Sequence, residues 1–320
     1  MVRISLGASG LVVPPLCIGT MYFGTQVPVQ ESHRILDRAL ERGYAFFDTA
    51  NNYAFWAEGA VGDESEQTIG SWLRSRARGS VLVATKVGAR PQPGSASLDS
   101  VLGLSRPAIR EQVEGSLRRL QTDYVDVLYA HIDDSLTPLE ETVSALLDEV
   151  ARGTARRIAC SNLSAERLSD AVDAVQGGPG YCAIQQRFTY LTPAEGADLT
   201  PHVLLSEDVM EVAERASMSR LGYSPLLGGA YSAPGRGVPD TYISENTERQ
   251  LSALRDVAST YEVDSGQVVL AWMAQRSRPV VPVVGVSSVQ QLESALVGAQ
   301  TQLDTAALQH LEQQRGTQHA

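Results

Sequence analysis

Four polar side chains of different chemistry stand at the ends of short apolar segments in the first half of the sequence. Asp48 ends one such segment, and Tyr53 lies five positions beyond it. Lys86 ends a second segment, and His131 follows a third. A phenol has a pKa of about 10, and a neighbouring ammonium favours the phenolate and so lowers that pKa. If the fold brings the four together, they form a proton-transfer set in which Tyr53 is the acid and His131 orients a carbonyl oxygen or shares its proton.

Each of these residues also has an ordinary structural role when it is considered alone. Asp48 fits a cap at a strand end, and Lys86 fits a surface lysine. His131 fits a core histidine with satisfied hydrogen bonds, and Tyr53 fits a loop residue. The chemical interpretation is favoured because the four occur together at equivalent positions. Its value depends on the elements that position them.

Short apolar segments and helical patterns alternate along the whole chain. Eight such alternations predict a parallel sheet. In a chain of 320 residues they favour a (β/α)8 TIM barrel that forms one domain over residues 1–320. An open doubly wound sheet is the alternative, but the Gly-x-Gly-x-x-Gly pattern that would support it after the first strand is absent. The predicted strands are 16–19, 44–47, 81–86, 125–130, 155–160, 181–184, 219–223 and 280–284.

Helices and turns complete the predicted barrel. Segments 3–6 and 11–13 flank Gly7-Ala8-Ser9-Gly10, which predicts an N-terminal β-hairpin. The last predicted helix, over 305–313, would be an extra element at the periphery of the barrel. Apolar positions three and four residues apart predict helices over 29–42, 63–76, 106–120, 165–175, 206–218, 246–261, 265–276, 288–299 and 305–313, with another that begins near Thr137.

Polar patterns at three of these helix starts fit capping boxes. The pairs are Asp63 with Glu66, Thr137 with Glu140, and Ser288 with Gln291. Long segments rich in Gly, Pro and Ser over 91–104 and 228–244 predict loops that shape a functional site.

Composition narrows the classes of function. The net charge is −11 and the isoelectric point is about 5.0, which disfavours non-specific binding to nucleic acid or to an anionic membrane. No membrane-spanning segment and no signal peptide are predicted. Cys17, Cys160 and Cys182 lie in apolar segments and are expected to be buried free thiols. A reducing, cytoplasmic location fits this pattern.

The chain resembles the aldo-keto reductases from the hairpin to about Ala299. The resemblance implies that a nicotinamide passes hydride to a carbonyl carbon while Tyr53 protonates the oxygen, in a tetrad of Asp48, Tyr53, Lys86 and His131. Several ordered motifs carry it: Phe47-Asp48-Thr49-Ala50 with Tyr53, Thr85-Lys86, Tyr129-Ala130-His131, Ser161-Asn162, Gln185, Tyr223-Ser224-Pro225-Leu226, and Val281-Pro282 with Gly285.

The resemblance also implies a cofactor site. Tyr223 would stack on the nicotinamide ring, and Ser161, Asn162 and Gln185 would hydrogen-bond its carboxamide. NADP(H) is favoured, but NAD(H) stays open because the turn after the last strand lacks the Lys or Arg that often binds the 2′-phosphate. The other positions implied for the cofactor are Gly19, Thr20, Ser224, Leu226, Gly228, Gly285, Ser287, Ser288 and Gln291.

Aromatic residues near the tetrad indicate the type of substrate. Tyr22, Phe55 and Trp56 follow the first two strands and are expected to line the substrate pocket. Such a pocket suits an aldehyde, ketone or keto-sugar. A nucleotide-binding regulatory subunit with little turnover is the alternative function, and the oligomeric state stays open. A metal-dependent hydrolase is disfavoured, because only His131 among the five histidines lies at a predicted strand end.

Overall fold

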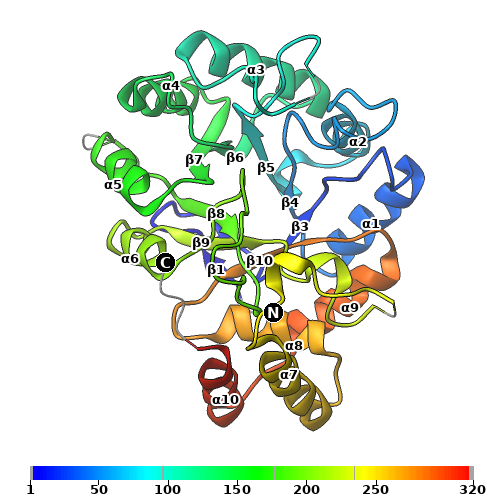
Figure 1. Ribbon diagram of the computed structural model, residues 1–320. Helices are drawn as coiled ribbons and strands as arrows, with labels where there is room; N and C mark the ends of the chain where they lie inside the picture. The colour runs from blue at the N-terminus through cyan, green and yellow to red at the C-terminus, as the bar shows by residue number, and fades with distance from the viewer. Residues whose placement is uncertain (1–2, 96, 176–177, 234, 317–320) are drawn as a thin grey trace.

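Eight short strands rich in Val, Ile, Leu and Ala form a closed parallel barrel with helices around it (Figure 1). The structure is a computed structural model that describes every residue except 1–2, 96, 176–177, 234 and 317–320. The barrel closes where the last strand pairs with the first. In order around the barrel the strands are β3 (Cys17–Gly19), β4 (Phe46–Asp48), β5 (Leu82–Val87), β6 (Val125–Ala130), β7 (Ala155–Ser161), β8 (Ala183–Arg187), β9 (Ser219–Tyr223) and β10 (Val281–Gly285).

Helices follow the strands and cover the outside of the barrel. Two helices follow β9. The first of them, α7 (Thr247–Tyr261), contacts the C-terminal helix α10 (Thr305–Arg315), and these two contacting helices are additions to the barrel pattern. The predicted TIM barrel with peripheral helices is confirmed. The remaining helices are α1 (Val29–Glu41), α2 (Glu64–Leu73), α3 (Arg106–Leu120), α4 (Leu139–Ala151), α5 (Ala165–Asp173), α6 (Glu207–Arg215), α8 (Ser265–Gln275) and α9 (Val289–Gln300), and single 3-10 turns span Arg78–Ser80, Leu227–Gly229 and Asp240–Tyr242.

A two-stranded hairpin closes the N-terminal end of the barrel. Its strands are β1 (Ile4–Ser5) and β2 (Val12–Val13), as predicted. Leu6, Leu11 and Val13 are buried in the same apolar cluster as the residues that line the barrel. Gly7 has φ +55°, and a Cβ there would lie 2.4 Å from the carbonyl oxygen of Cys182. The hairpin therefore fits tightly against the barrel, and the opposite end is the one left for function.

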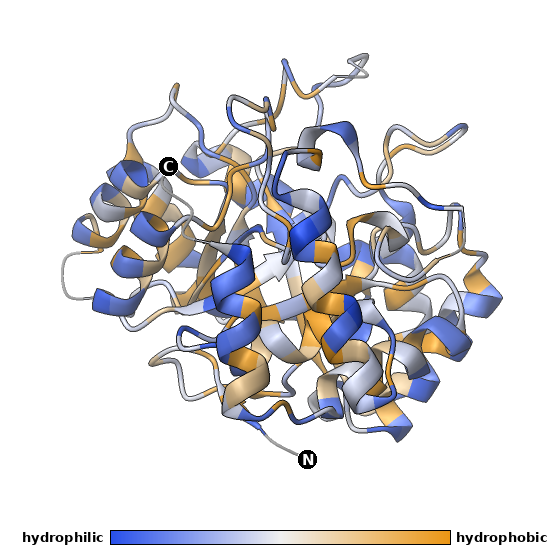
Figure 2. Cartoon of the chain, turned by 60° about the horizontal axis from the view of Figure 1, so that its bottom comes forward, coloured by the Kyte–Doolittle hydropathy of each residue, from blue (hydrophilic) through white to orange (hydrophobic). Residues whose placement is uncertain are grey.

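Apolar side chains form two layers, one inside the barrel and one between the strands and the helices. The hydropathy colouring shows the same division, with apolar ribbon faces turned inward and polar faces outward (Figure 2). The three cysteines are buried and free, as the sequence predicted. Among the described residues, no helix combines the length and apolar character needed to cross a membrane.

Two of the predicted capping boxes are wrong. Asp63 makes no cap at α2, because its carboxylate pairs with Arg90 at 2.6 Å. Glu66 turns inward instead and accepts a hydrogen bond from Thr85. At α4 the side chain of Thr137 donates to Asp134 at 2.7 Å, and no side chain caps the helix. The expected cap residue bonds to a distant partner, Arg90, in the first case and to a nearby loop residue, Asp134, in the second.

The third predicted box, at the start of α9, is half formed. Ser288 Oγ accepts from the backbone N–H of Gln291 at 3.2 Å, as a cap should. The Gln291 side chain, however, accepts from the N–H of Ser287 at 2.8 Å, one residue before the cap. Two backbone donors at the start of α9 are therefore bonded to side chains of the same turn.

Close packing of α2 on α3 provides a test of the fold. A Cβ added at Gly70 would lie 2.1 Å from the carbonyl oxygen of Arg119, which is backbone. We expect Gly70→Ala to destabilise the protein by about 1–3 kcal/mol, although alanine is the better helix former. Gly79→Ala is the control, because no atom lies within 4 Å of its added Cβ. Equal urea midpoints for both variants would contradict this packing.

Candidate active site

The alternation of side chains along the strands gathers the site at one end of the barrel. Successive side chains of a strand point to opposite faces. On every barrel strand a residue of the inner apolar layer is followed, two positions later, by a residue that also faces inward at the carboxyl end. The inner residues are Cys17, Phe46, Ala84, Tyr129, Ala159, Ala183, Leu221 and Val283, and their successors are Gly19, Asp48, Lys86, His131, Ser161, Gln185, Tyr223 and Gly285.

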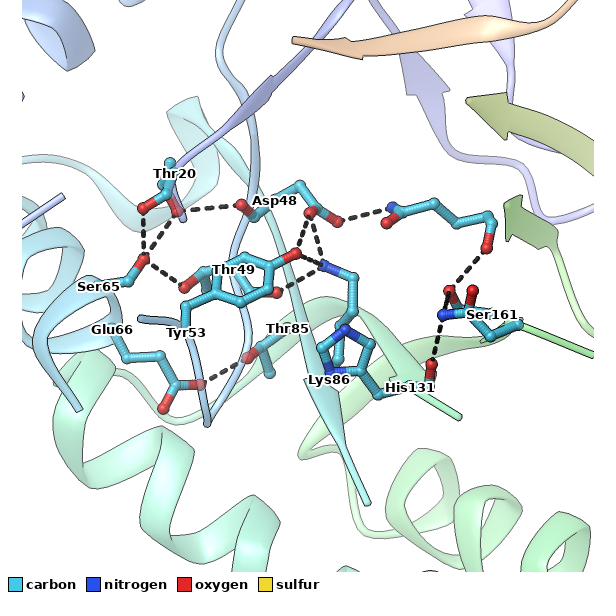
Figure 3. Close-up of polar contacts among 12 residues, drawn as sticks. Thr20, Asp48, Thr49, Tyr53, Ser65, Glu66, Thr85, Lys86, His131 and Ser161 are labelled. Carbon is cyan, nitrogen blue, oxygen red and sulfur yellow. Dashed lines mark hydrogen bonds and ion pairs between the residues drawn. The ribbon is translucent and has the colours of Figure 1, made fainter. Parts of the chain in front are cut away.

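Asp48, Tyr53 and Lys86 are in direct contact (Figure 3). Lys86 Nζ lies 2.5 Å from Asp48 Oδ2 and 2.7 Å from the Tyr53 hydroxyl oxygen. The Tyr53 hydroxyl donates to Asp48 Oδ2 at 3.1 Å. Lys86 donates further to the carbonyl oxygen of Thr49 at 2.9 Å. The ammonium and the carboxylate are both buried, so solvent screens their attraction little.

The pKa of the Tyr53 phenol is raised well above its ordinary value, chiefly by burial and then by the Asp48 carboxylate. The sequence-based expectation that Lys86 lowers this pKa is therefore wrong for this structure. The reason is that burial raises the pKa of the phenol most, and the Asp48 carboxylate, which accepts its hydrogen bond at 3.1 Å, raises it further. Burial also lowers the pKa of Lys86, with Asp48 opposing that effect. Tyr53 thus keeps its proton at neutral pH.

His131 completes the predicted set by lying against Tyr53. The two rings meet edge to face with centroids 5.8 Å apart. His131 is anchored through its backbone, which donates to Val87 and accepts from Asn162. Its Nδ1 is buried and has no hydrogen-bond partner among the described residues. Burial, and then the Lys86 charge, lower the His131 pKa well below its ordinary value, so the imidazole is neutral at pH 7.

A polar shell that the sequence did not predict supports Asp48 and its neighbours. Thr20 is fully buried, and its hydroxyl donates to the Asp48 carbonyl oxygen at 3.0 Å. Ser65 of α2 links that hydroxyl to Thr49, with oxygen distances of 2.9 and 2.8 Å. Thr20 was predicted to bind the cofactor, but its side chain is already hydrogen-bonded to the backbone of Asp48 and to Ser65.

Glu66 is a buried carboxylate beside this shell. It accepts from Thr85 Oγ1 at 2.5 Å and from Arg119 Nε at 2.7 Å. Thr85 immediately precedes Lys86 on β5, so α2 and α3 fix the strand that carries the lysine. The sequence predicts Glu66 as the partner of Asp63 in a capping box. In the structure Ser65 and Glu66 are both buried residues of α2.

The residues predicted to bind a carboxamide lie together and bond to one another. Ser161 Oγ donates to the Gln185 carbonyl oxygen at 2.6 Å, and Gln185 Nε2 donates to Asp48 Oδ1 at 2.9 Å. Asn162 Nδ2 donates to the His131 carbonyl oxygen, and its Oδ1 accepts from the Tyr223 hydroxyl at 2.7 Å. Gln185 thus joins this cluster to the tetrad through Asp48.

His202, which the sequence analysis did not single out, lies against Tyr223. Its Nδ1 is 3.1 Å from the Tyr223 hydroxyl oxygen, and the rings meet at 5.6 Å. Burial lowers the pKa of His202. His202 belongs to the long segment between β8 and α6, which no pattern in the sequence related to β9.

The loops after β9 and β10 contain the remaining residues predicted for the cofactor. Ser224, Leu227, Gly228 and Gly229 all have positive φ, between +45° and +97°. Backbone N–H groups in such a turn form concavities that suit anions, and phosphate sites of parallel barrels often lie after the seventh and eighth strands. Leu226 opens the 3-10 turn between them. Gly285 ends β10, and no atom lies within 4 Å of a Cβ added there.

The aromatic residues predicted for the substrate lie beside the first two strands. Phe55 and Trp56 pack edge to face at 5.0 Å, and Trp56 is 50% exposed. Tyr22 is half-buried and packs against the core. Trp56 follows Tyr53 by three residues and exposes apolar surface, so its predicted substrate role stays a prediction. Among the described residues, no group of three or more His, Cys, Asp or Glu side chains is arranged to hold a metal ion.

Comparison with known proteins agrees with this geometry. The family model of the aldo/keto reductase family matches residues 15–315. The chain belongs to this family. It is 30% identical over 347 residues to an aldo-keto reductase of Alternaria alternata, AFTS1, covering 96% of this chain and 90% of the relative. It is 26% identical over 308 residues to L-glyceraldehyde 3-phosphate reductase of Escherichia coli, covering 90% of this chain and 84% of the relative.

Two further aldo-keto reductase comparisons concern function and fold. A norsolorinic acid reductase of Emericella nidulans is 28% identical over 323 residues, covering 97% of this chain and 80% of the relative. The crystal structure of the thermostable aldo-keto reductase Tm1743, solved with the inhibitor epalrestat, superposes with a TM-score of 0.76 at 24% identity. That match covers 98% of this chain and 100% of the other, so the barrel fold is shared along the whole chain.

The buried neutral His131 makes stability depend on pH. Its pKa is lowered in the folded protein, so below pH 6.5 the unfolded chain takes up a proton that the folded chain refuses. We expect His131 to remove about 1.4 kcal/mol of stability per pH unit below about 6.5. His131→Gln should lack this dependence, measured by urea unfolding at pH 7, 6 and 5. Parallel stability curves for the two proteins would show that His131 titrates normally.

Proposed function

We propose that this aldo-keto reductase reduces a carbonyl group with hydride from a nicotinamide dinucleotide and with Tyr53 as the proton donor. The contact of Tyr53 with Lys86 at 2.7 Å, inside a fully buried Lys86–Asp48 pair, supports this assignment most directly. A phenol held against an ammonium is arranged to release a proton and to have the resulting phenolate stabilised.

The raised pKa of Tyr53 is compatible with this role. An alkoxide formed at a reduced carbonyl is the conjugate base of an alcohol, which is about as weak an acid as water and far weaker than a phenol. Proton transfer from the phenol to that oxygen is therefore favourable even from a weakly acidic tyrosine. The Lys86 ammonium then stabilises the negative charge of the phenolate, and Asp48 keeps Lys86 in place through the 2.5 Å contact. The neutral His131 beside Tyr53 orients the carbonyl oxygen.

The residues present fit a bound dinucleotide. When bound, the reduced nicotinamide supplies the hydride. Tyr223 offers a ring at the carboxyl end of β9, next to the amides of Asn162 and Gln185. The positive-φ turn from Ser224 to Gly229 offers backbone donors for the pyrophosphate. For the amides to bind a carboxamide, Asn162 must exchange one of its internal hydrogen bonds for the ligand. The family resemblance favours NADP(H), and NAD(H) is the alternative.

The substrate is proposed to be an aldehyde, ketone or keto-sugar. Phe55 and the half-exposed Trp56 give an apolar, aromatic border on the side of Tyr53. The relatives named above include reductases of a sugar-type aldehyde phosphate and of norsolorinic acid, so family membership leaves the carbonyl compound open. A purified protein that binds the dinucleotide but turns over no carbonyl compound would favour the regulatory-subunit alternative.

Removal of the proposed proton donor is the primary test. We expect Tyr53→Phe to lower kcat for carbonyl reduction by about 10²- to 10⁴-fold, with dinucleotide affinity nearly unchanged because the ring remains. Tyr124→Phe is the matched control, since Tyr124 precedes β6 at the other end of the barrel. Near-normal turnover by Tyr53→Phe in a panel of aldehydes, ketones and keto-sugars would exclude Tyr53 as the acid.

The charge of Lys86 has its own test. Lys86→Met keeps the length of the side chain but leaves Asp48 buried without its ammonium and Tyr53 without its charged neighbour. We expect kcat to fall by at least about 10²-fold and KM to change much less. The dinucleotide should still bind, which calorimetric titration of the variant can establish. Retention of kcat would mean that the phenol acts without the ammonium.

A further inference from the structure

Three backbone N–H groups at the start of α9 already have side-chain acceptors. The N–H of Ser287 donates to Gln291 Oε1 at 2.8 Å, and the N–H of Gln291 donates to Ser288 Oγ at 3.2 Å. The N–H of Val289, the first residue of α9, donates to a carboxylate, Glu31 Oε1, at 3.3 Å. A free helix N-terminus favours anions, but here a negative charge of the chain itself occupies that position.

Glu31 reaches α9 from the first turn of α1 and is largely covered. Its side chain is 21% exposed, and Arg34 Nη2 lies 2.5 Å from its other oxygen. α1 and α9 are neighbours in the fold, so the contact belongs to a helix interface and not to a mobile tail. The carboxylate is thus fixed beside the loop after β10, the eighth strand of the barrel.

Within the part of the chain that the structure describes, the arginines of α1 and its end are all paired with carboxylates of α1 or α9. The turn from Gly285 to Gln291 contains neither Lys nor Arg. Arg34 is paired with Glu31. Arg38 and Arg42, the other arginines of α1 and its end, both pair with Glu293 of α9, at 2.5 and 2.9 Å. A dianionic phosphate at this position would meet Glu31 and would have to break one of these pairs.

We infer that Glu31 is a cofactor-specificity residue that selects NAD(H) against NADP(H). The inference rests on the proposed function, in which the dinucleotide lies along the loops after β9 and β10. A carboxylate at this place accepts hydrogen bonds from ribose hydroxyls, which is how acidic residues favour NAD in other dinucleotide sites. The same carboxylate repels a 2′-phosphate and competes with it for the Val289 N–H. The chain would then depart from the NADP(H) preference that the resemblance suggested.

Direct binding measurements test this inference without reliance on turnover. We expect calorimetric titration of the wild type to give a Kd for NADH at least about tenfold below that for NADPH. Glu31→Gln keeps the acceptor for Val289 but removes the charge, so the NADPH Kd should fall by about tenfold while the NADH Kd changes little. The fragments 5′-AMP and 2′,5′-ADP should show the same contrast, because they lack the nicotinamide.

Two control variants of α1 separate this role from general charge effects. Glu41→Gln removes one charge from the other end of the same helix, where the side chain is 63% exposed, and should leave both Kd values unchanged. Arg34→Gln should not weaken NADPH binding. A wild type that prefers NADPH, or NADPH binding lost in Arg34→Gln, would overturn the inference and show that Arg34 leaves Glu31 to bind the phosphate. If neither NADH nor NADPH bound, the proposed function itself would be refuted.

Discussion

The ion pair between Lys86 and Asp48 is the constraint on which the site depends. Both groups are buried inside the barrel with Nζ 2.5 Å from Oδ2, and removing each charge from water costs several kcal/mol. The pair is tolerated because its remaining hydrogen-bonding capacity is satisfied, through Thr49, Tyr53 and Gln185. Adjacent parallel strands are needed to place an aspartate and a lysine at this distance, and β4 and β5 provide them.

The barrel turns a simple alternation into a chemical site. Because each strand places every second side chain inward, one inner apolar layer is followed by one polar layer at the carboxyl ends. The apolar layer excludes water beneath Tyr53, and this burial, with the Asp48 charge, raises the phenol's pKa. In the proposed reaction, Lys86 therefore acts mainly on the phenolate that proton transfer would create, and less on the resting tyrosine. Glu66 and Arg119, from α2 and α3, hold β5 in register behind the lysine.

The region proposed for the cofactor differs from the tetrad in its exposure to solvent. Its groups lie on loops and helix ends near the surface, where charge effects are weaker and depend on salt. Small differences in which side chain reaches a helix N-terminus then decide ligand selectivity. The contact of Glu31 with Val289 is the basis for the inferred NAD(H) preference, because it places a carboxylate at a helix start where a 2′-phosphate would need a cation.

The sequence by itself determined the eight-stranded barrel, the hairpin and the strand-end positions of Asp48, Lys86 and His131, because period-two apolar segments and helical spacing are local signals. It also identified the family from ordered motifs. Only the tertiary structure decided that Tyr53 is made less acidic, that Glu66 turns inward, and that Glu31 reaches α9. The first outcome depends mainly on burial. The other two depend on partners more than fifteen residues away in sequence. The local sequence pattern around Glu66 is the same whether its side chain caps its own helix or bonds to the next strand.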